Sequence, residues 1–316
     1  MSKAINELHT PVALEYAIEM LGPALTGTSP VLVDGTLGLG GHTEAFLERF
    51  ENLTVVGIDR DEKALELAST RLARFGARFI PAHAIYSEIL EVLEAEGIES
   101  VEGILLDLGV SSMQLDEADR GFAYSFDAPL DMRMNQTVGV TAAEILNSYG
   151  ENDLARIFKE YGEERYAKQV AKAIVERRKA EPFSSSADLA SLVSKVVPYI
   201  PGKTTGHPAK RVFQALRIEV NGELEILEDT IPAAIDALKV GGRILVMSYH
   251  SLEDGIVKKA LVHAATSLTP IEMPIELPEH APIVRMLTKG TVVASDAEKN
   301  ANPRAASVRM RAAEKI

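Results

Sequence analysis

Cysteine is absent from the 316 residues of this chain. Its absence excludes disulfide bonds, thiolate catalysis and cysteine-ligated zinc sites together. The seven histidines form no His-Glu-x-x-His pattern, so we expect no metal site. No apolar run reaches the ~18 residues of a membrane span, and the first residues contain no uninterrupted apolar segment of the signal-peptide kind. We therefore expect no membrane partner and a cytoplasmic location.

Positive charge is also in short supply, with 33 Lys and Arg against 46 Asp and Glu and a net charge of −13. This balance argues against a protein that coats nucleic acid indiscriminately. The distribution is uneven, because Lys and Arg outnumber Asp and Glu between Glu151 and Asn221. That window is either a surface for a polyanion or an ordinary solvated helical face.

A glycine-rich turn directly follows an apolar run in the segment VLVDGTLGLGGHT, residues 31–43. The run is typical of a strand buried on both faces, and the glycines permit backbone conformations that a Cβ would block. The strand pattern repeats within residues 53–61, and Asp59 stands at the carboxyl end of this second strand. A carboxylate there can accept two bonds from a ribose diol, which predicts a nucleoside-containing cofactor.

The details of the turn favour S-adenosylmethionine over NAD as that cofactor. Counting from Gly38, the third glycine of a dinucleotide fingerprint would stand at position 43, where the chain has Thr. A P-loop is excluded because no Lys-Ser or Lys-Thr follows the glycines. The acids before the turn and after the second strand, Asp34 and Asp59, suit a cofactor that carries an ammonium, a sulfonium and a ribose.

Strand patterns alternate with helical ones in the first third of the chain, as in a parallel sheet. The alternation stops after Ser112, where a loop over residues 113–135 precedes a purely helical region at 140–197. Capping boxes begin helices there, a clear one at Thr141 with Glu144 and a weaker one at Ser185 with Asp188. The predicted strands are 31–36, 53–58, 77–82 and 101–108, then 241–248, and finally 283–288 and 307–312, which would close the sheet as a hairpin.

This order predicts an α/β protein whose sheet domain is split by an insertion. We place the sheet domain at residues 1–113 and 215–316, and a mostly helical substrate-recognition domain at residues 114–214.

Two candidate catalytic residues follow predicted strands. Asp107 ends the apolar run 101–108, and a carboxylate there is costly to bury unless it holds a partner, although it could instead cap the next turn. His250 follows the fifth strand, and a structural role is as well supported as a substrate contact. A serine–histidine–acid triad at 248–254 is rejected, because G-x-S-x-G is missing and Ser251 with Asp254 reads as a capping box for a helix at 252–264.

A continuous helix is predicted from about residue 209 to 228, with two faces. Its buried stripe comprises Phe213, Leu216, Val220, Leu224 and Leu227. A second stripe suits RNA phosphates and bases, or else belongs to an ordinary amphipathic helix; it comprises Lys210, Gln214, Arg217 and Asn221.

Taken together, these segments resemble the MraW/RsmH family, bacterial methyltransferases that act on N4 of a cytidine in small-subunit ribosomal RNA. The resemblance runs nearly end to end. It is carried by HTPV at 9–12, DGTLGLGGHT at 34–43, GIDRD at 57–61, DLGVSS at 107–112 with QLD at 114–116, RGF at 120–122, PLDMRM at 129–134, HPAKRVFQALRI at 207–218, NGEL at 221–224, HSLED at 250–254 and NPR at 302–304.

The resemblance implies a class I (Rossmann-like) methyltransferase sheet with an inserted helical domain. It implies that S-adenosylmethionine is the cofactor and contacts Gly40, Gly41, His42, Asp59, Asp107 and Gln114. A further contact, usually Phe in the family, falls on Tyr86, which keeps an aromatic face for the adenine. The substrate would be small-subunit ribosomal RNA, bound by Lys210, Arg211, Gln214, Arg217 and Asn221.

Two positions depart from the family pattern. Gly255 and Ala306 stand where the family commonly has Arg, so two contacts to RNA phosphate or a carboxylate are in question. Phe122, Tyr124 and Phe126 on the inserted loop are candidates for stacking on an extruded base, and packing is the equally supported alternative.

The expected reaction is methylation of a cytidine at N4 in an assembled or partly assembled subunit. Asp107 would lie where cofactor and substrate meet, with His250 as orienter or proton acceptor. One alternative is a methyltransferase for a small molecule or a protein, which leaves Lys210, Arg211 and Arg217 without a role. Another is a non-catalytic ribosome-assembly factor that uses the cofactor only structurally.

Overall fold

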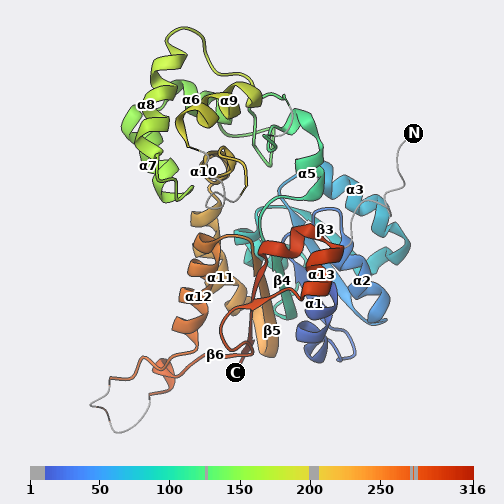
Figure 1. Ribbon diagram of the computed structural model, residues 1–316. Coiled ribbons are helices and arrows are strands. Elements are labelled where there is room, and N and C mark those ends of the chain that lie inside the picture. Colours follow the sequence, from blue (N-terminus) through green and yellow to red (C-terminus); the bar gives the residue numbers. More distant parts are fainter. Residues whose placement is uncertain (1–10, 125–126, 199–205, 271–272, 274–276) are drawn as a thin grey trace. The chain divides into compact units, whose positions relative to one another are not determined.

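The computed structural model describes residues 11–124, 127–198, 206–270, 273 and 277–316. The chain forms two compact units (Figure 1). The sheet unit comprises Met1–Gly109 and Leu224–Ile316, and the inserted unit comprises Val110–Glu223. The predicted boundary at residue 215 would have divided the helix Lys210–Asn221 (α10), which instead belongs wholly to the inserted unit. Its residues Val212, Phe213 and Leu216 are part of that unit's core.

The sheet unit is built on eight strands in the order β3-β2-β1-β4-β5-β8-β6, with β7 also paired to β8. The first five strands are mutually parallel, and β8 runs antiparallel to β5, β6 and β7. Their bounds are β1 Val31–Asp34, β2 Thr54–Asp59, β3 Phe79–His83, β4 Val101–Asp107, β5 Leu238–Ser248, β6 Val284–Met286, β7 Val292–Val293 and β8 Arg309–Lys315.

The predicted parallel strands are confirmed. Their sequences are apolar runs because helices cover both faces of the sheet. One face packs on α1 (Leu14–Leu21), α2 (Gly41–Arg49) and α3 (Glu62–Leu72). The other packs on α4 (Ile89–Ala95), α11 (Glu223–Ala237) and α12 (Ser251–Ala264). Neighbouring residues of one strand, such as Leu105 and Leu106, contribute to opposite cores.

The closing strands also pair as predicted, although they do not form a simple hairpin. β6 and β8 are antiparallel neighbours, and β8 lies between β6 and β5. The segment between them contains β7 and α13 (Asp296–Ala301). β7 was not predicted, because two residues are too few to show a periodicity.

The strand order reverses between β1 and β4, which places a topological switch point at their carboxyl ends. The chain passes from β1 outward to β2 and β3, and then returns to add β4 on the other side of β1. Asp34, Asp59 and Asp107 are the last residues of β1, β2 and β4. Ligands of open α/β sheets bind in the crevice at such a point.

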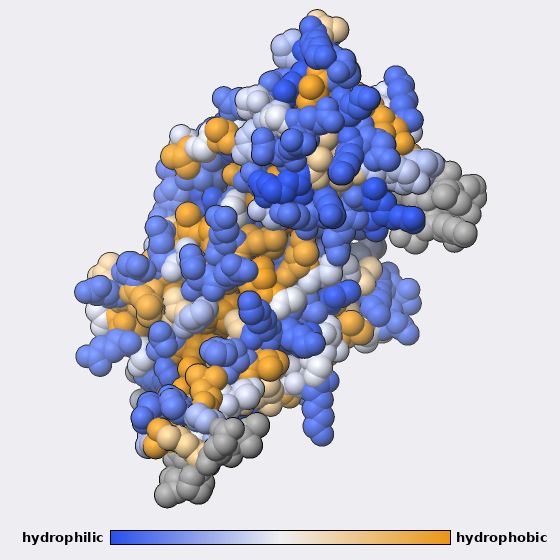
Figure 2. Space-filling model, turned by 90° about the vertical axis from the view of Figure 1, so that its left-hand side faces the viewer, coloured by the Kyte–Doolittle hydropathy of each residue, from blue (hydrophilic) through white to orange (hydrophobic). Residues whose placement is uncertain are grey.

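The inserted unit is helical, as predicted for residues 140–197. It contains α5 (Ser112–Asp116), α6 (Ala142–Ser148), α7 (Glu151–Glu160), α8 (Ala167–Arg178), α9 (Ser186–Val196) and α10. Thr141 and Glu144 form the predicted capping box of α6, and the Ser185 side chain caps α9. The face shown in Figure 2 is largely hydrophilic over this unit, in keeping with the charged outer residues of α7 and α8.

The single helix predicted over residues 209–228 is wrong. α10 ends at Asn221, Gly222 adopts a left-handed conformation with φ of 62°, and α11 begins at Glu223. Glycine tolerates this conformation and commonly ends helices in this way. The apolar stripe is consequently divided, since Phe213 and Leu216 lie in the core of the inserted unit and Leu227 in a core of the sheet unit.

Candidate cofactor and substrate site

The turn after β1 is braced by Asp34, which is 2% exposed. Its Oδ2 accepts a hydrogen bond from the Thr43 hydroxyl at 2.7 Å, and its Oδ1 accepts one from the Thr36 backbone N–H at 3.3 Å. Burial raises the pKa of Asp34, and His42 and Thr43 partly offset that rise. Both carboxylate oxygens therefore brace the turn itself, and a contact of Asp34 to the cofactor stays a prediction.

Asp59 at the end of β2 is held by two backbone N–H groups. Gly38 donates to Oδ2 at 2.7 Å and Asp61 donates to Oδ1 at 2.8 Å. A carboxylate has about four acceptor positions, so each oxygen keeps capacity for one more donor. Burial raises the pKa of Asp59 to about 6, against the lowering effect of the two N–H bonds. This arrangement fits a carboxylate that grips the two hydroxyls of a ribose.

The glycines at the start of α2 are required by close packing and backbone conformation. Gly40 precedes the helix with φ of 74°, and a Cβ on it would lie 2.9 Å from Leu72 Cδ1. A Cβ on Gly41 would lie 2.8 Å from Pro11 Cγ. The first N–H groups of a helix have no intrahelical acceptor and attract anions. The predicted contacts at Gly40, Gly41 and His42 therefore belong to one helix N-terminus suited to a cofactor carboxylate.

Tyr86 lies beside the glycine turn, where an aromatic contact to the cofactor was predicted. It begins a short 3₁₀ turn after β3, and its side chain is partly buried. A Cβ added to Gly35 would lie 3.4 Å from Tyr86 Cβ, and one of its other neighbours would be Leu106 Cδ2 at 2.6 Å. The glycine at position 35 thus lets β4 and Tyr86 approach the turn. Tyr86, Asp59 and the α2 N-terminus together fit the adenine, the ribose and the carboxylate of S-adenosylmethionine.

Asp107 at the end of β4 is anchored from two neighbouring segments. Its backbone N–H donates to the Thr36 hydroxyl at 2.7 Å, and its Oδ1 accepts a hydrogen bond from the Tyr249 hydroxyl at 2.6 Å. Its Oδ2 lies 3.9 Å from His42 Nδ1, whose ring is oriented by a 2.9 Å contact from Nε2 to the Val12 carbonyl. Burial raises the pKa of Asp107, and the largest opposing influence is His42.

His250 is the N-cap of α12, so its side chain has a structural use. Nδ1 accepts from the Glu253 backbone N–H at 3.4 Å, and Nε2 lies 3.0 Å from Glu253 Oε1. Glu253 completes a capping box by accepting the backbone N–H groups of Tyr249 and His250. The predicted capping box of Ser251 with Asp254 is therefore wrong by one residue. Nδ1 is thus used by the cap, whereas Nε2 is buried without a hydrogen-bond partner in the described part of the chain, so a role of His250 as orienter or proton acceptor stays a prediction.

Asp254 anchors α12 to β8. It is 8% exposed and accepts hydrogen bonds from Arg311 Nε at 2.7 Å and Arg311 Nη2 at 3.2 Å. Arg311 is itself 5% exposed and also donates to the Thr291 hydroxyl. Asp254, the last residue of the HSLED block, is thus part of a buried ion pair, which agrees with the rejection of a serine–histidine–acid triad. Gly255 and Ala306, which stand where the family commonly has Arg, are both exposed.

The proposed RNA stripe on α10 consists largely of side chains with partners inside the inserted unit. Arg217 forms two bonds to Glu223, at 2.8 and 2.9 Å, and Gln214 donates to the Tyr161 carbonyl at 2.9 Å. Arg211 is exposed and donates to the Glu163 carbonyl at 2.7 Å. Lys210 is exposed at the start of the helix. Lys210 and Arg211 therefore remain the better placed of the predicted RNA contacts.

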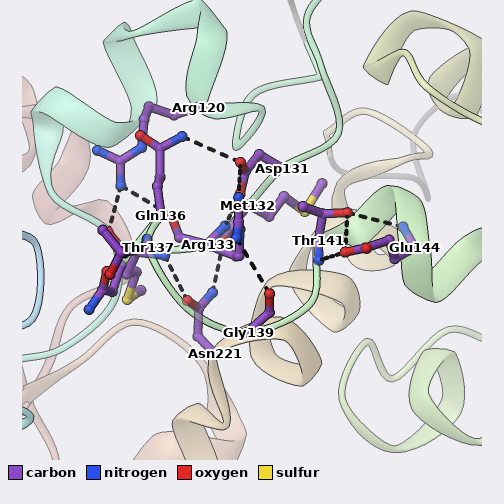
Figure 3. Close-up of polar contacts among 12 residues, drawn as sticks. Arg120, Asp131, Met132, Arg133, Gln136, Thr137, Gly139, Thr141, Glu144 and Asn221 are labelled. Carbon is purple, nitrogen blue, oxygen red and sulfur yellow. Dashed lines mark hydrogen bonds and ion pairs between the residues drawn. The ribbon is translucent and has the colours of Figure 1, made fainter.

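Asn221 instead clamps the loop that contains the PLDMRM segment, as Figure 3 shows. Its side chain is 4% exposed, accepts from Met134 N at 2.8 Å and donates to the Met132 carbonyl at 2.8 Å. Arg120 grips the same loop by donating to the carbonyls of Arg133 and Met134. Because these bonds hold backbone inside the unit, we do not retain Asn221 as an RNA contact.

Gln114 and the aromatic residues lie in the inserted unit. Gln114 is 4% exposed and completes a capping box with Ser111 at the start of α5; its contact to the cofactor stays a prediction. Phe122 is packed in the core, whereas Tyr124 is partly exposed and stacks on exposed His207 with ring centroids 4.8 Å apart. Phe126 lies outside the described residues.

The described part of the chain contains neither a metal-binding cluster nor a membrane-spanning helix. No group of three or more His, Asp and Glu side chains there is arranged to hold a metal ion. No helix there has the length and apolar character needed to cross a membrane.

The doubly wound sheet, the glycine turn after β1 and the carboxylates that end β2 and β4 define a class I methyltransferase. The chain belongs to the MraW methylase family, whose model matches residues 6–316. Ribosomal RNA small subunit methyltransferase H of Nocardia farcinica is 56% identical over 311 residues, which cover 98% of this chain and 96% of the relative. The protein of the same name from Saccharopolyspora erythraea is 55% identical and covers 98% of this chain and 94% of its own length.

Proposed function

We propose that this protein uses S-adenosylmethionine to methylate N4 of a specific cytidine in small-subunit ribosomal RNA. The identity of the substrate is supported by the match of 98% of the chain to relatives named ribosomal RNA small subunit methyltransferase H. The geometry that supports the reaction is the cluster of carboxylates at the switch point of the sheet. The cytoplasmic location, where such RNA is found in bacteria, is part of the same proposal.

Three elements of the chain would hold the cofactor. Asp59 accepts the ribose hydroxyls with the acceptor positions that Gly38 and Asp61 leave open. The α2 N-terminus at Gly40, Gly41 and His42 receives a carboxylate, and Tyr86 offers a ring face for the adenine. When bound, S-adenosylmethionine supplies an electrophilic methyl group.

The chemical problem on the substrate side is the weak nucleophilicity of the cytosine amino group, whose lone pair is delocalised into the ring. Asp107 addresses it by accepting an N–H of that amino group, which orients the nitrogen and returns electron density to it. Transfer of a methyl group to the amino nitrogen would require this nitrogen to lose one proton. Asp107 is the proposed acceptor at this strand end, since its Oδ2 accepts no hydrogen bond from the described residues, whereas Nδ1 of His250 caps α12.

The preferred form of the substrate is an assembled or partly assembled subunit. A net charge of −13 cannot supply strong general attraction to phosphate, so specific contacts to a shaped target must carry recognition. Lys210 and Arg211 at the exposed start of α10 are the proposed phosphate contacts. The stacked pair of Tyr124 and His207 offers an aromatic surface for a base.

Transfer of a labelled methyl group tests this proposal. Small subunits purified from a strain that lacks the protein, and ribosomal RNA extracted from them, are each incubated with the protein and methyl-labelled cofactor. We expect label in the RNA of the subunits and much less in the extracted RNA. Asp107→Asn keeps the side-chain size but removes the charge, and it should abolish methyl transfer. Calorimetry measures the cofactor binding of this variant separately. Label in protein would contradict the RNA substrate. Equal label in both RNA samples would contradict the preference for an assembled subunit.

A further inference from the structure

The Asp107 carboxylate is tied on one oxygen and open on the other. Oδ1 receives the Tyr249 hydroxyl at 2.6 Å. Oδ2 lies 3.9 Å from His42 Nδ1, which is beyond hydrogen-bonding distance, and accepts no hydrogen bond from the described residues. The side chain is 23% exposed. The carboxylate therefore presents one specific oxygen at the sheet edge.

Tyr249 is itself held at three points, so the position of its hydroxyl is well determined. Its backbone N–H donates to Glu253 Oε2 at 2.7 Å, and Glu253 is 2% exposed. Its ring lies against Gly109, where an added Cβ would be 3.6 Å from Tyr249 Cδ2. The third point is the bond to Asp107. The pairing of Asp107 with Met247 across β4 and β5 brings these two strand ends side by side.

We propose that Tyr249 is a positioning residue for methyl transfer, which holds Oδ1 of Asp107 so that Oδ2 faces the amino group of the substrate. This inference rests on the proposed function and deepens it. The phenol acts only as a donor, because burial and the charge of Asp107 raise the pKa of Tyr249 and keep it protonated at neutral pH. A carboxylate with one oxygen so fixed has lost the freedom to rotate away from the substrate.

The hydroxyl of Tyr249 should also favour the ionised form of Asp107, which is the form that accepts a proton. Two groups lower the pKa of Asp107, namely His42 from α2 through electrostatic attraction and Tyr249 through its hydrogen bond. Asp34 from β1 and Glu253 from α12 act in the opposite direction through their negative charge. Loss of the hydroxyl removes one of the two favourable influences, so ionisation of Asp107 should require a higher pH.

The test is the pH dependence of kcat for Tyr249→Phe, which removes the hydroxyl and keeps the ring. We expect kcat on the subunit substrate to fall about 10- to 100-fold, the range for loss of one hydrogen bond to a charged group. We also expect the acid limb of the kcat profile to move to higher pH. Affinity for S-adenosylhomocysteine should stay within about threefold, because the change acts on the reacting group and leaves the Asp59 grip intact.

Tyr149→Phe is the matched control. Tyr149 likewise donates its hydroxyl to a carboxylate, Glu219 Oε1 at 2.9 Å, but within the inserted unit. Its removal should leave the kcat profile in place. If Tyr249→Phe folds poorly, Tyr249→Met offers a flexible apolar side chain without the hydroxyl and should show the same shift.

The outcomes separate this inference from the function on which it rests. A wild-type protein that transfers methyl groups, with a Tyr249→Phe profile that keeps the same acid limb, would overturn the positioning role and leave the function intact. A wild-type protein that transfers no methyl group to the subunit would overturn the proposed function before any variant is compared.

Discussion

Gly38 donates its backbone N–H to Asp59 Oδ2 at 2.7 Å, and this bond joins the glycine turn after β1 to the carboxyl end of β2. The two segments that carry the cofactor signature in the sequence are therefore one structural unit. The bond fixes the carboxylate and leaves it able to accept further donors. It also explains why the turn needs an amide at residue 38, where φ is 52° and glycine is favoured.

Cofactor affinity should depend on pH through Asp59. The ionised carboxylate accepts the ribose hydroxyls, and the pKa of Asp59 is raised to about 6. Affinity is therefore complete above pH 7 and falls as the pH drops through 6, because protonation replaces an acceptor with a donor. Calorimetric titration with S-adenosylhomocysteine between pH 5 and pH 8 measures this directly.

Asp59→Ala should weaken binding about 10- to 100-fold at pH 8, the order of hydrogen bonds to a charged group. The pH dependence of cofactor affinity centred near 6 should disappear in the same variant. Affinity that is unchanged in this variant would remove Asp59 from the cofactor site.

The Asp254–Arg311 pair should matter for stability and not for cofactor binding. Asp254→Ala leaves the Arg311 guanidinium buried without its bidentate partner, a change that costs about 3–5 kcal/mol. Urea unfolding gives the free energy of unfolding. Arg285→Ala is the control, since its ion pair with Glu314 is largely exposed on the arginine side and should contribute less than about 1 kcal/mol. Equal losses in the two variants would contradict the structural role of Asp254.

Asn221 and Lys210 should separate stability from RNA binding on α10. Asn221→Ala removes the partners of Met134 N and the Met132 carbonyl and should cost about 2–4 kcal/mol of unfolding free energy. Lys210→Ala should leave stability within about 0.5 kcal/mol and lower the salt dependence of subunit binding by about one unit of log–log slope. A salt slope that Lys210→Ala leaves unchanged would exclude Lys210 as a phosphate contact.

Gly255→Ala should stabilise the protein by about 1 kcal/mol, the usual difference between the two residues inside a helix. Gly255 lies within α12, and a Cβ on it would meet no atom within 4 Å. Gly222→Ala is the contrasting variant, because φ of 62° there disfavours any residue with a Cβ. Urea midpoints should therefore move in opposite directions. A loss of stability in Gly255→Ala would show that the glycine has a packing role.

The sheet and the carboxylates at its edge were predictable because they depend on local signals. Apolar runs covered on both faces mark β1, β2, β4 and β5, and an acid after such a run falls at a strand end by the geometry of a parallel sheet. The capping box at Thr141 and Glu144 was predictable for the same reason, since all of its atoms lie within four residues.

Contacts between distant segments could not be predicted in this way. Tyr249 reaches Asp107 because of the register of β4 against β5, and Asn221 clamps a loop 87 residues earlier in the chain. The end of α10 was missed although Asn221-Gly222 is a common helix end, because the apolar spacing continues past it. His250, and not Ser251, is the N-cap of α12. This cap was not predicted because it uses a ring nitrogen, and histidine is not among the residues that N-cap propensities favour.

The nucleosides of small-subunit ribosomal RNA report directly on the proposed reaction. Subunits from a strain lacking the protein are incubated with the protein and S-adenosylmethionine, digested to nucleosides and compared with synthetic standards by mass spectrometry. We predict one added methyl group per RNA, on N4 of a cytidine, and none with Asp107→Asn. A methyl group on C5, on a ribose or on adenine would contradict the N4 assignment, and the absence of any added methyl group would contradict the proposed enzyme function.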